Sequence, residues 1–405
     1  VRPLRGGAVI TVEEALEKVF ALAAPLEAET VALREAHGRV LAEPVAARRE
    51  QPPFPAAAMD GYAVRSAEAT PGARFRVIGE APAGRAFAGS VGAGEAVRIF
   101  TGAPVPEGAD RVVIQEDTER DGDEITLTGG LDAGPHVRPA GADFSPGDSI
   151  AAPRRLGPAD LALMAAMNLP ELPVTRRPVV ALIATGDELV MPGEEPGPDQ
   201  IIASNAFGLA AMVEAEGAEA RLLPIARDTA ESLRLAFELA ADADLIVTIG
   251  GASVGEHDLV AGVADDLGME RAFYKIAMRP GKPLMAGRLG DSVMLGLPGN
   301  PVSALVCGHL FLLPALRVML GLPAAAAPRR RGRLAADVGP NGPREHYMRA
   351  RLTSEGVLPF DRQDSSLLSI LSEADALLVR PIRDDARPAG TEVEYVPIRP
   401  AWLDT

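Results

Sequence analysis

Arginine carries almost all of the positive charge in this 405-residue chain, and the exceptions point to chemistry. Only three lysines occur, Lys18, Lys275 and Lys282, and two of them lie in the short segment 274–283. Lysine offers a compact ammonium group, whereas arginine offers a planar fork of donors, so the two are not interchangeable at a binding site. The pattern predicts that Lys275 and Lys282 serve an anion-binding site.

Three glycine-rich loops, 185–189, 250–258 and 296–301, each follow an apolar run. Glycine lets backbone N–H groups approach an anion closely, and a helix that starts after the loop adds a favourable dipole. One such loop alone would also suit an ordinary tight turn, but three from one sheet are expected to converge on one crevice. The predicted binding residues of the last two loops are Gly250, Gly251, Ser253, Gly255, Pro298, Asn300 and Pro301.

The same crevice would gather charges of both signs. The carboxylates of Glu188 and Asp258 would face the cations of Lys275, Arg279 and Lys282. Such a mixture suits an oxyanion bound together with a divalent cation that oxygen atoms hold. The charges alone would equally suit a network of ion pairs on the surface.

The elements that must position these loops follow from hydrophobic periodicity. Runs of apolar residues at 179–184 and 245–249 predict buried strands, and helical spacing predicts helices over 204–216 and 229–241. A further helix is predicted over 11–24, which opens with a Thr-x-x-Glu capping box. Strands that alternate with helices favour a parallel, doubly wound α/β sheet, whose ligands bind beyond the carboxyl ends of the strands.

The rest of the chain has a different sequence pattern. Short alternating apolar runs broken by glycine and proline predict a mostly β module, in which Asp60, Thr101 and Asp143 lie in polar loops. The Asp60-Gly61 pair also suits an ordinary hairpin turn. The expected domains are an N-terminal helical and linking region (1–50 with 147–177), the β module (51–146), the α/β domain (178–327) and a small C-terminal β-domain (328–405).

Composition narrows the classes of function. A formal net charge of −16 opposes binding to nucleic acid or to an anionic membrane surface. The single cysteine, Cys307, excludes an intrachain disulfide and a cysteine-based metal cluster, and its apolar neighbours predict a buried, inert thiol. Because the sequence shows no evident signal peptide and no uninterrupted apolar run of spanning length, the expected compartment is the cytoplasm.

Taken together, the motifs resemble the molybdopterin molybdenumtransferase family, which includes the bacterial MoeA proteins and the E domain of gephyrin. The resemblance covers roughly residues 10 to 400, and its segments follow the family's order. They are 58–63, 101–106, 137–141, 185–189, 250–258, 279–283 and 296–301. It implies an elongated homodimer of four-domain chains, whose sheet domain is shared with molybdopterin adenylyltransferases. It also implies that molybdate and adenylylated molybdopterin give molybdenum cofactor and AMP with a divalent cation, usually magnesium.

The resemblance also implies roles for individual residues. Those matching catalytic positions are Asp60, Thr101, Asp143, Glu188, Asp228, Asp258, Lys275 and Lys282. Of these, Glu188, Asp228 and Asp258 would surround Mg²⁺, while Arg279, Arg349 and Ser365 would bind substrate. The site would lie between the sheet domain of one subunit and the β module of the other. The adenylyltransferase and acceptor molybdoenzymes are possible partners.

Two departures from the family and two alternative functions stay open. Many relatives carry lysine where this chain has Arg279, and the family's usual glycine-flanked serine appears here as Gln363-Asp364-Ser365-Ser366. The same fold could insert tungstate, whose size and charge are nearly those of molybdate. The chain could also be a non-catalytic dimeric scaffold that binds molybdopterin.

Overall fold

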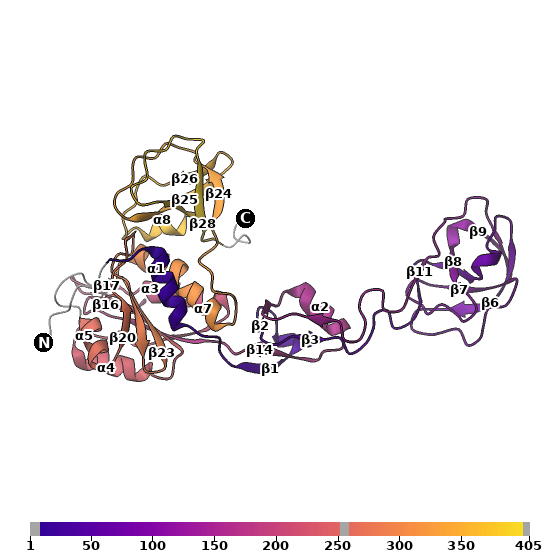
Figure 1. Cartoon of the computed structure of the whole chain (residues 1–405), viewed down its shortest axis with the longest axis horizontal. Helices are drawn as coiled ribbons and strands as arrows, with labels where there is room; N and C mark the ends of the chain where they lie inside the picture. The colour runs from indigo at the N-terminus through magenta and orange to yellow at the C-terminus, as the bar shows by residue number, and fades with distance from the viewer. Residues whose placement is uncertain (1–8, 252–258, 400–405) are drawn as a thin grey trace. The chain divides into compact units, whose positions relative to one another are not determined.

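The computed structural model describes residues 9–251 and 259–399 (Figure 1). The chain forms two compact units, Val1–Glu29 with Thr175–Thr405, and Thr30–Val174. Each unit is described by itself. The domain limits expected from the sequence stay predictions.

The first unit is built on a six-stranded sheet. Its strands, in spatial order, are β18 (Glu219–Leu222), β15 (Val179–Ala184), β19 (Leu245–Ile249), β23 (Ser292–Leu297), β22 (Met285–Leu289) and β20 (Glu270–Phe273). The first four pair in parallel, but β22 pairs antiparallel with β23 and β20 antiparallel with β22. The expectation of a parallel sheet is therefore wrong for β22, the strand between β23 and the edge strand β20. The cause is a two-residue turn, Gly290-Asp291, in which Gly290 adopts a φ of 58° and reverses the chain.

Helices cover both faces of this sheet, as the doubly wound prediction requires (Figure 1). Along β15, Val180 and Leu182 face one hydrophobic core while Ala181 and Ile183 face the other, because successive side chains of a strand point to opposite sides. The helices on the first face are α1 (Val12–Leu22), α3 (Asn205–Glu216), α6 (Pro301–Cys307) and α7 (Leu313–Met319); those on the second are α4 (Ala230–Leu239) and α5 (Leu259–Asp266).

Local sequence signals explain where several of these helices begin. The predicted capping box of α1 is present: Glu14 N donates to Thr11 Oγ1 at 3.1 Å and Thr11 N donates to Glu14 Oε2 at 2.8 Å. Thr229 caps α4 by accepting from Ser232 N at 3.2 Å. The predicted helices over 11–24, 204–216 and 229–241 are thus confirmed, with ends that differ by a few residues.

One long apolar helix runs from Pro301 to Met319, with a π-helical stretch at Gly308–Leu312. By length and a hydropathy of 1.8 it could cross a membrane, but 78% of its apolar window is buried inside the protein. It therefore has the character of a core helix. Cys307 lies on it fully buried, and burial raises the pKa of its thiol, as an inert cysteine requires.

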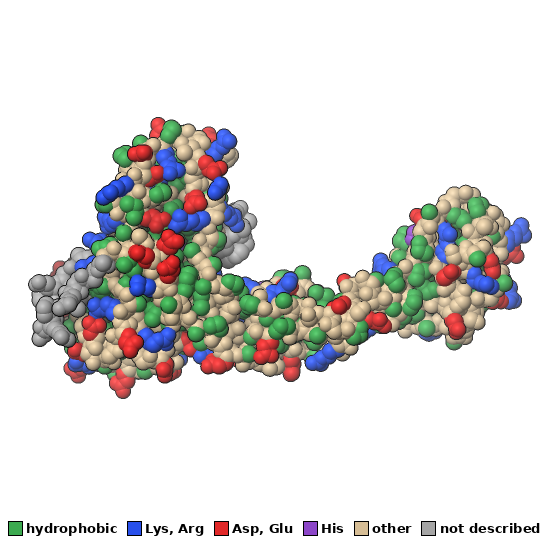
Figure 2. Space-filling model, in the orientation of Figure 1, with side chains coloured by type: hydrophobic (Ala, Val, Ile, Leu, Met, Phe, Trp, Pro, Cys, Tyr) green, Lys and Arg blue, Asp and Glu red, His purple; other side chains and the backbone are tan. Residues whose placement is uncertain are grey.

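The C-terminal β-domain belongs to the same unit. Its sheet contains β21 (Met278–Arg279), β25 (Glu345–Thr353), β27 (Ala376–Arg380), β28 (Glu392–Pro397) and β24 (Arg330–Arg333), with β26 (Gly356–Pro359) paired to β25 and α8 (Leu368–Ser372) beside it. Figure 2 shows acidic and basic side chains interspersed over this domain. The strand β21 comes from the segment with the two lysines, so that segment joins the α/β domain to the C-terminal sheet.

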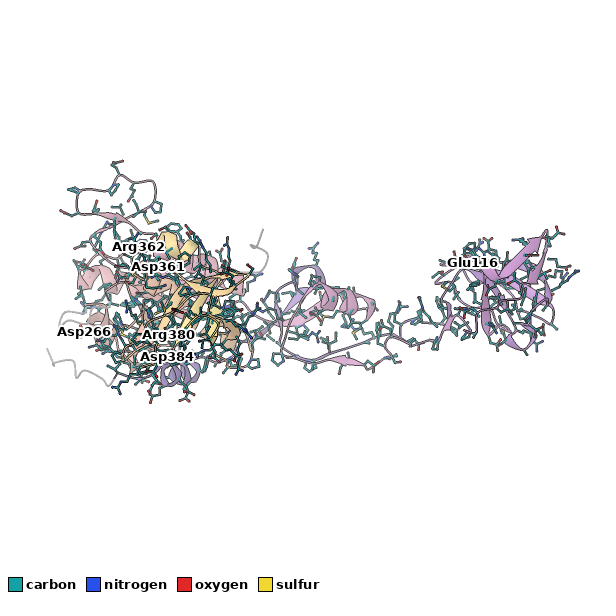
Figure 3. All side chains as sticks on the ribbon, turned by 90° about the horizontal axis from the view of Figure 1, so that it is seen from above. Glu116, Asp266, Asp361, Arg362, Arg380 and Asp384 are labelled. Atoms are coloured by element: carbon teal, nitrogen blue, oxygen red, sulfur yellow. The ribbon has the colours of Figure 1, made fainter. Side chains whose placement is uncertain are left out.

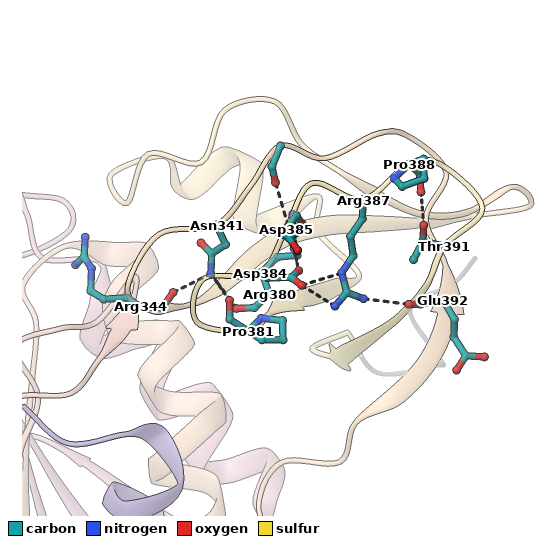
Figure 4. Close-up of polar contacts among 11 residues, drawn as sticks. Asn341, Arg344, Arg380, Pro381, Asp384, Asp385, Arg387, Pro388, Thr391 and Glu392 are labelled. Carbon is teal, nitrogen blue, oxygen red and sulfur yellow. Dashed lines mark hydrogen bonds and ion pairs between the residues drawn. The ribbon is translucent and has the colours of Figure 1, made fainter.

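A buried charge cluster stabilises the loop between β27 and β28 (Figures 3 and 4). Arg380, which is 2% exposed, donates from Nε to Asp384 Oδ2 at 2.5 Å. Arg387 donates to Asp384 Oδ1 from Nε at 3.0 Å and from Nη2 at 2.7 Å. The carboxylate is therefore shared by two guanidinium groups.

The second unit contains two larger sheets. One has four strands, β1 (Ala28–Ala32), β14 (Glu171–Thr175), β2 (Val40–Leu41) and β13 (Arg154–Arg155), and packs with α2 (Pro158–Ala166). The other is the six-stranded sheet of the β module, with β8 (Arg111–Ile114), β5 (Gly61–Val64), β7 (Glu95–Ile99), β6 (Arg74–Ala81), β10 (Glu124–Leu127) and β9 (Thr118–Asp121) in order. Short strand pairs complete the described chain: β3 (Val45–Ala46) with β12 (Ser149–Ile150), β4 (Ala56–Ala57) with β11 (Val137–Arg138), and, in the first unit, β16 (Leu189–Val190) with β17 (Ile201–Ile202).

Candidate active site

A cleft of about 580 Å³ lies at the carboxyl ends of the adjacent strands β15, β19 and β23. All three predicted loops contribute to it, so their convergence is confirmed. Its walls are formed by Ala184, Thr185, Glu188, Leu189, Ile201, Ile202, Ala203, Ser204, Asn205, Ala206, Ile249, Gly250, Pro283, Pro298, Gly299, Asn300, Pro301 and Ser366. The position agrees with the rule that ligands of doubly wound sheets bind beyond the strand ends.

Glycine is required where β19 enters this cleft. Gly250 and Gly251 have φ values of 98° and 65°, which favour glycine. A Cβ atom on Gly250 would lie 2.8 Å from the carbonyl oxygen of Thr185, and one on Gly251 would lie 2.2 Å from Val260 Cγ2. The backbone therefore passes close to the β15 loop only because both residues lack a side chain.

The loop after β23 is tied to two other segments. Asn205 Nδ2, at the start of α3, donates to Gly299 O at 2.7 Å, and Asn300 Nδ2 donates to Ser365 Oγ at 3.1 Å. Val302 N also donates to Ser365 O at 3.1 Å. Asn300, Pro301 and Ser365 are thus brought together, as the predicted site needs, although Ser365 supports the cleft wall and does not line it.

Arg349 lies beneath this wall. It is 1% exposed, and its Nη1 donates to Asp364 O at 2.7 Å while its Nε donates to Gln363 Oε1 at 3.2 Å. Desolvation by burial, with a smaller effect of Arg279, lowers the pKa of its guanidinium. Arg349 supports the loop that carries Ser365, and its role in binding substrate stays a prediction.

The lysine segment reaches the cleft only through Pro283, which lines it. Neither lysine nor Arg279 is among the lining residues of the described chain. The ammonium nitrogen of Lys275 lies 5.5 Å from the centre of the Tyr274 ring, and Arg279 lies on β21 opposite His346. These three cations are therefore close in sequence to Pro283, a lining residue, but the structure does not place them on the wall of the cleft.

The carboxylates expected to hold a metal are only partly brought together. Glu188 lines the cleft, while Asp228 N donates to Asp187 Oδ1 at 3.1 Å on the same loop. Ser253, Gly255 and Asp258 lie outside the described residues. Within 9–251 and 259–399, no group of three His, Cys, Asp or Glu residues is arranged to hold a metal ion.

A residue that the sequence reasoning missed holds the Glu188 loop in place. Arg227 Nη1 donates to the carbonyl oxygens of Asp187 at 3.2 Å and Leu189 at 3.0 Å. Thr185, Ser204 and Asn205 in the cleft wall were also missed, although the asparagine at a predicted helix start was a usable signal.

The β module holds a second predicted cluster. Asp60 Oδ1 accepts hydrogen bonds of 2.7 Å from both the backbone N and the Oγ1 of Thr101. These bonds, the backbone one first, lower the pKa of the Asp60 carboxyl, so it is ionised at neutral pH. Asp143 has no contact with this pair among the described interactions; its backbone N donates to Gln51 O at 2.9 Å.

Asp60-Gly61 is not a hairpin turn. The strand before it, β4, pairs with β11, whereas β5 pairs with β7 and β8 in another sheet. Glycine is needed at position 61 because a Cβ atom would lie 1.9 Å from Val113 O. Arg98 also packs here, 4.9 Å from the Phe100 ring, and donates to Gly61 O at 3.1 Å.

The fold is that of a multidomain protein with a cleft of small-molecule size at the strand ends of a doubly wound sheet. Three family models match consecutive regions: the MoeA N-terminal region (domain I and II) at 10–168, a probable molybdopterin binding domain at 181–318, and the MoeA C-terminal region (domain IV) at 331–398. The chain belongs to the molybdopterin molybdenumtransferase family, which confirms the resemblance seen in the sequence.

Individual relatives support this assignment. Molybdopterin molybdenumtransferase 2 of Mycobacterium tuberculosis is 39% identical over 383 residues, covering 90% of this chain and 94% of that protein. The molybdopterin molybdenumtransferase of a Nostoc species is 35% identical over 387 residues, covering 91% and 88%. A crystal structure of a molybdopterin biosynthesis MoeA protein from Pyrococcus horikoshii aligns with a TM-score of 0.84 at 32% identity, covering 97% of this chain and 100% of that one.

Proposed function

We propose that this chain is a molybdopterin molybdenumtransferase, which inserts molybdenum into adenylylated molybdopterin and releases AMP. The observation that carries the proposal is the convergence of three strand-end loops on one cleft. Its volume, about 580 Å³, is in the range that small-molecule sites occupy. Relatives that carry the name of this activity match nearly the whole chain.

The chemistry of the substrates suits the residues near the cleft. Molybdate and the phosphates of adenylylated molybdopterin are anions, so cations and backbone N–H groups must neutralise them in a protein of net charge −16. Lys275, Arg279 and Lys282 are proposed to supply that positive charge. Closure or substrate binding would have to bring them to the cleft, because none lines it as described.

We propose a magnesium ion at this cleft, for which Glu188 is the one proposed ligand that lines the wall. Magnesium is commonly held by one or two carboxylates together with substrate phosphates and water, so Glu188 in the cleft wall fits as one such ligand. The ion would polarise the phosphoanhydride. Asp228 and Asp258 are proposed as further ligands. Titration of the parent protein and of Glu188→Ala with Mg²⁺ and with Mn²⁺, in the presence and absence of AMP, would test whether binding depends on Glu188.

We also propose a cytoplasmic homodimer in which Asp60 and Thr101 of one copy act on substrate held by the other. Mixing two inactive variants tests this. If Asp60→Ala and Lys282→Ala subunits exchange, half of the dimers become mixed and each gains one intact site, which restores about a quarter of wild-type activity. Activity that stays at zero after proven subunit exchange would place both residues in the same subunit's site.

The direct test uses purified protein, adenylylated molybdopterin, molybdate and magnesium. We expect release of AMP and a product that activates an apo-molybdoenzyme. Failure of both would reject the transferase proposal in favour of the scaffold, which would still bind molybdopterin. Replacing molybdate by tungstate in competition decides between the two oxyanions.

A further inference from the structure

Two neighbouring serines at the cleft have different surroundings. Ser365 is half-buried, and its Oγ and O both accept hydrogen bonds from the 300–302 loop, at 3.1 Å each. Ser366 is exposed and lines the cleft. The hydroxyl available to a ligand is therefore that of Ser366.

Asp364 fixes the orientation of this hydroxyl. Ser366 N and Ser366 Oγ both donate to Asp364 Oδ1, at 2.8 and 2.6 Å. An ionised carboxylate can only accept, so the Ser366 proton points at Asp364 and the free lone pairs of Oγ remain for other groups. The same hydrogen bonds, the side-chain one first, lower the pKa of Asp364 and keep it charged at neutral pH.

The loop is held firmly from below. Gln363 Nε2 donates to the carbonyl oxygens of Arg349 at 3.0 Å and Phe360 at 2.8 Å, and Gln363 Oε1 accepts from Arg349 N at 3.0 Å. Arg362, whose carbonyl oxygen accepts from Arg349 Nη2 at 3.4 Å, precedes it on the same loop (Figure 3). These contacts fix the backbone of the loop that carries Asp364 and Ser366.

The Ser366 hydroxyl oxygen, an acceptor beside the Asp364 carboxylate, favours a ligand that carries a hydrogen-bond donor. Molybdate and phosphate oxygens are themselves acceptors, so they can neither donate to Ser366 nor lie favourably near Asp364. Heteroaromatic rings with N–H or amino groups can donate. We propose that Ser366, oriented by Asp364, is a positioning residue that accepts a hydrogen bond from such a ring of the substrate. This rests on the proposed function, and the ring is either the pterin or the adenine of the adenylylated substrate.

Steady-state kinetics of variants at Ser366 and Asp364 test this role. Ser366→Ala is expected to raise KM for adenylylated molybdopterin about three- to tenfold, because one hydrogen bond is lost, while kcat changes little. Ser366→Thr keeps the hydroxyl and should restore KM. Asp364→Asn keeps an acceptor for Ser366 and should have a smaller effect than Asp364→Ala. Ser369→Ala is the matched control, because Ser369 is exposed on α8, is not among the lining residues of the cleft, and its hydroxyl makes no hydrogen bond within the described residues.

Calorimetric titrations with AMP and with molybdopterin identify the ring. Loss of affinity for molybdopterin alone in Ser366→Ala assigns the pterin, and loss for AMP alone assigns the adenine. Unchanged affinity for both, or a KM equal to that of the Ser369 control, would overturn the inference. If wild-type protein released no AMP from the adenylylated substrate, the proposed function would fail, and the two titrations would still decide the role of Ser366.

Discussion

The lysine segment turns at Gly281, and replacing this glycine should be costly. Gly281 has a φ of 108°, and a Cβ atom there would lie 2.6 Å from Cys307 Sγ and 3.2 Å from Met278 Cε. An alanine at such a backbone angle costs about 1–2 kcal/mol, and overpacking a closed core adds about 1–3 kcal/mol. Gly281→Ala is therefore expected to destabilise the protein by about 2–5 kcal/mol.

Two comparisons isolate the packing contribution. Gly290 also has a positive φ, 58°, but no atom lies within 4 Å of a Cβ built there, so Gly290→Ala should cost only about 1 kcal/mol. Removing Sγ with Cys307→Ala gives the new methyl group space, so the Gly281→Ala cost should fall by about 1 kcal/mol or more in that background.

Urea unfolding followed by circular dichroism measures these differences. Hydrogen exchange assigns the transition to the α/β domain, since a chain with several domains need not unfold in one step. Equal costs at positions 281 and 290, or strict additivity of Gly281→Ala with Cys307→Ala, would refute the steric reasoning.

Three further outcomes are expected. Thr101→Val should raise the pKa of Asp60, measured by carbon NMR, because one of its two donors is lost; no rise would mean that the hydroxyl does not bond the carboxylate. Burial, then nearby arginines, lowers the pKa of His346 from 6.5 to about 4, so the folded state resists protonation and loses stability as pH falls through this interval. His346→Gln should reduce the loss of unfolding free energy between pH 7 and pH 5, by at most about 1.4 kcal/mol per pH unit. Urea unfolding at the two pH values measures this loss, and an equal loss in the parent and the variant would contradict the prediction. Asp384→Ala should cost about 3 kcal/mol, because Arg380 and Arg387 lose the carboxylate they share, whereas Asp242→Ala, at an exposed ion pair, should shift the unfolding midpoint much less; equal midpoints would reject the cluster's role.

Much of the α/β domain was predictable because its signals are local. The run at 179–184 is wholly apolar, the run at 245–249 contains a single polar residue, the buried Thr248, and helices over 11–24 and 229–241 begin at capping residues. Convergence of the loops followed from parallel pairing alone. The antiparallel strand β22 was not predicted, although the turn that follows it, Gly290-Asp291, has a common hairpin composition.

Side-chain surroundings were less predictable than backbone elements. A buried arginine looks like an exposed one in sequence, and Arg349 is buried by acceptors on a loop about 14 residues further along the chain. Likewise, Asp60-Gly61 has the composition of a hairpin turn, but the strands on either side of it pair in different sheets. Such assignments depend on long-range contacts, which short sequence patterns do not contain.

The hydrogen bonds described for Lys275 and Lys282 are made by their backbone. Lys275 O accepts from Ile10 N at 3.2 Å, and Lys282 O accepts from Ile276 N and Leu284 N at 3.1 Å each. In the described part of the chain, no carboxylate pairs with either ammonium group. Other side chains could meet these backbone requirements, so folding alone does not explain why lysine occurs here in a chain that otherwise uses arginine. Lys275→Arg and Lys282→Arg should therefore keep the urea midpoint of the parent protein while lowering molybdenum insertion. Full insertion by both variants would show that charge alone matters there and that the rarity of lysine elsewhere is only a bias of composition.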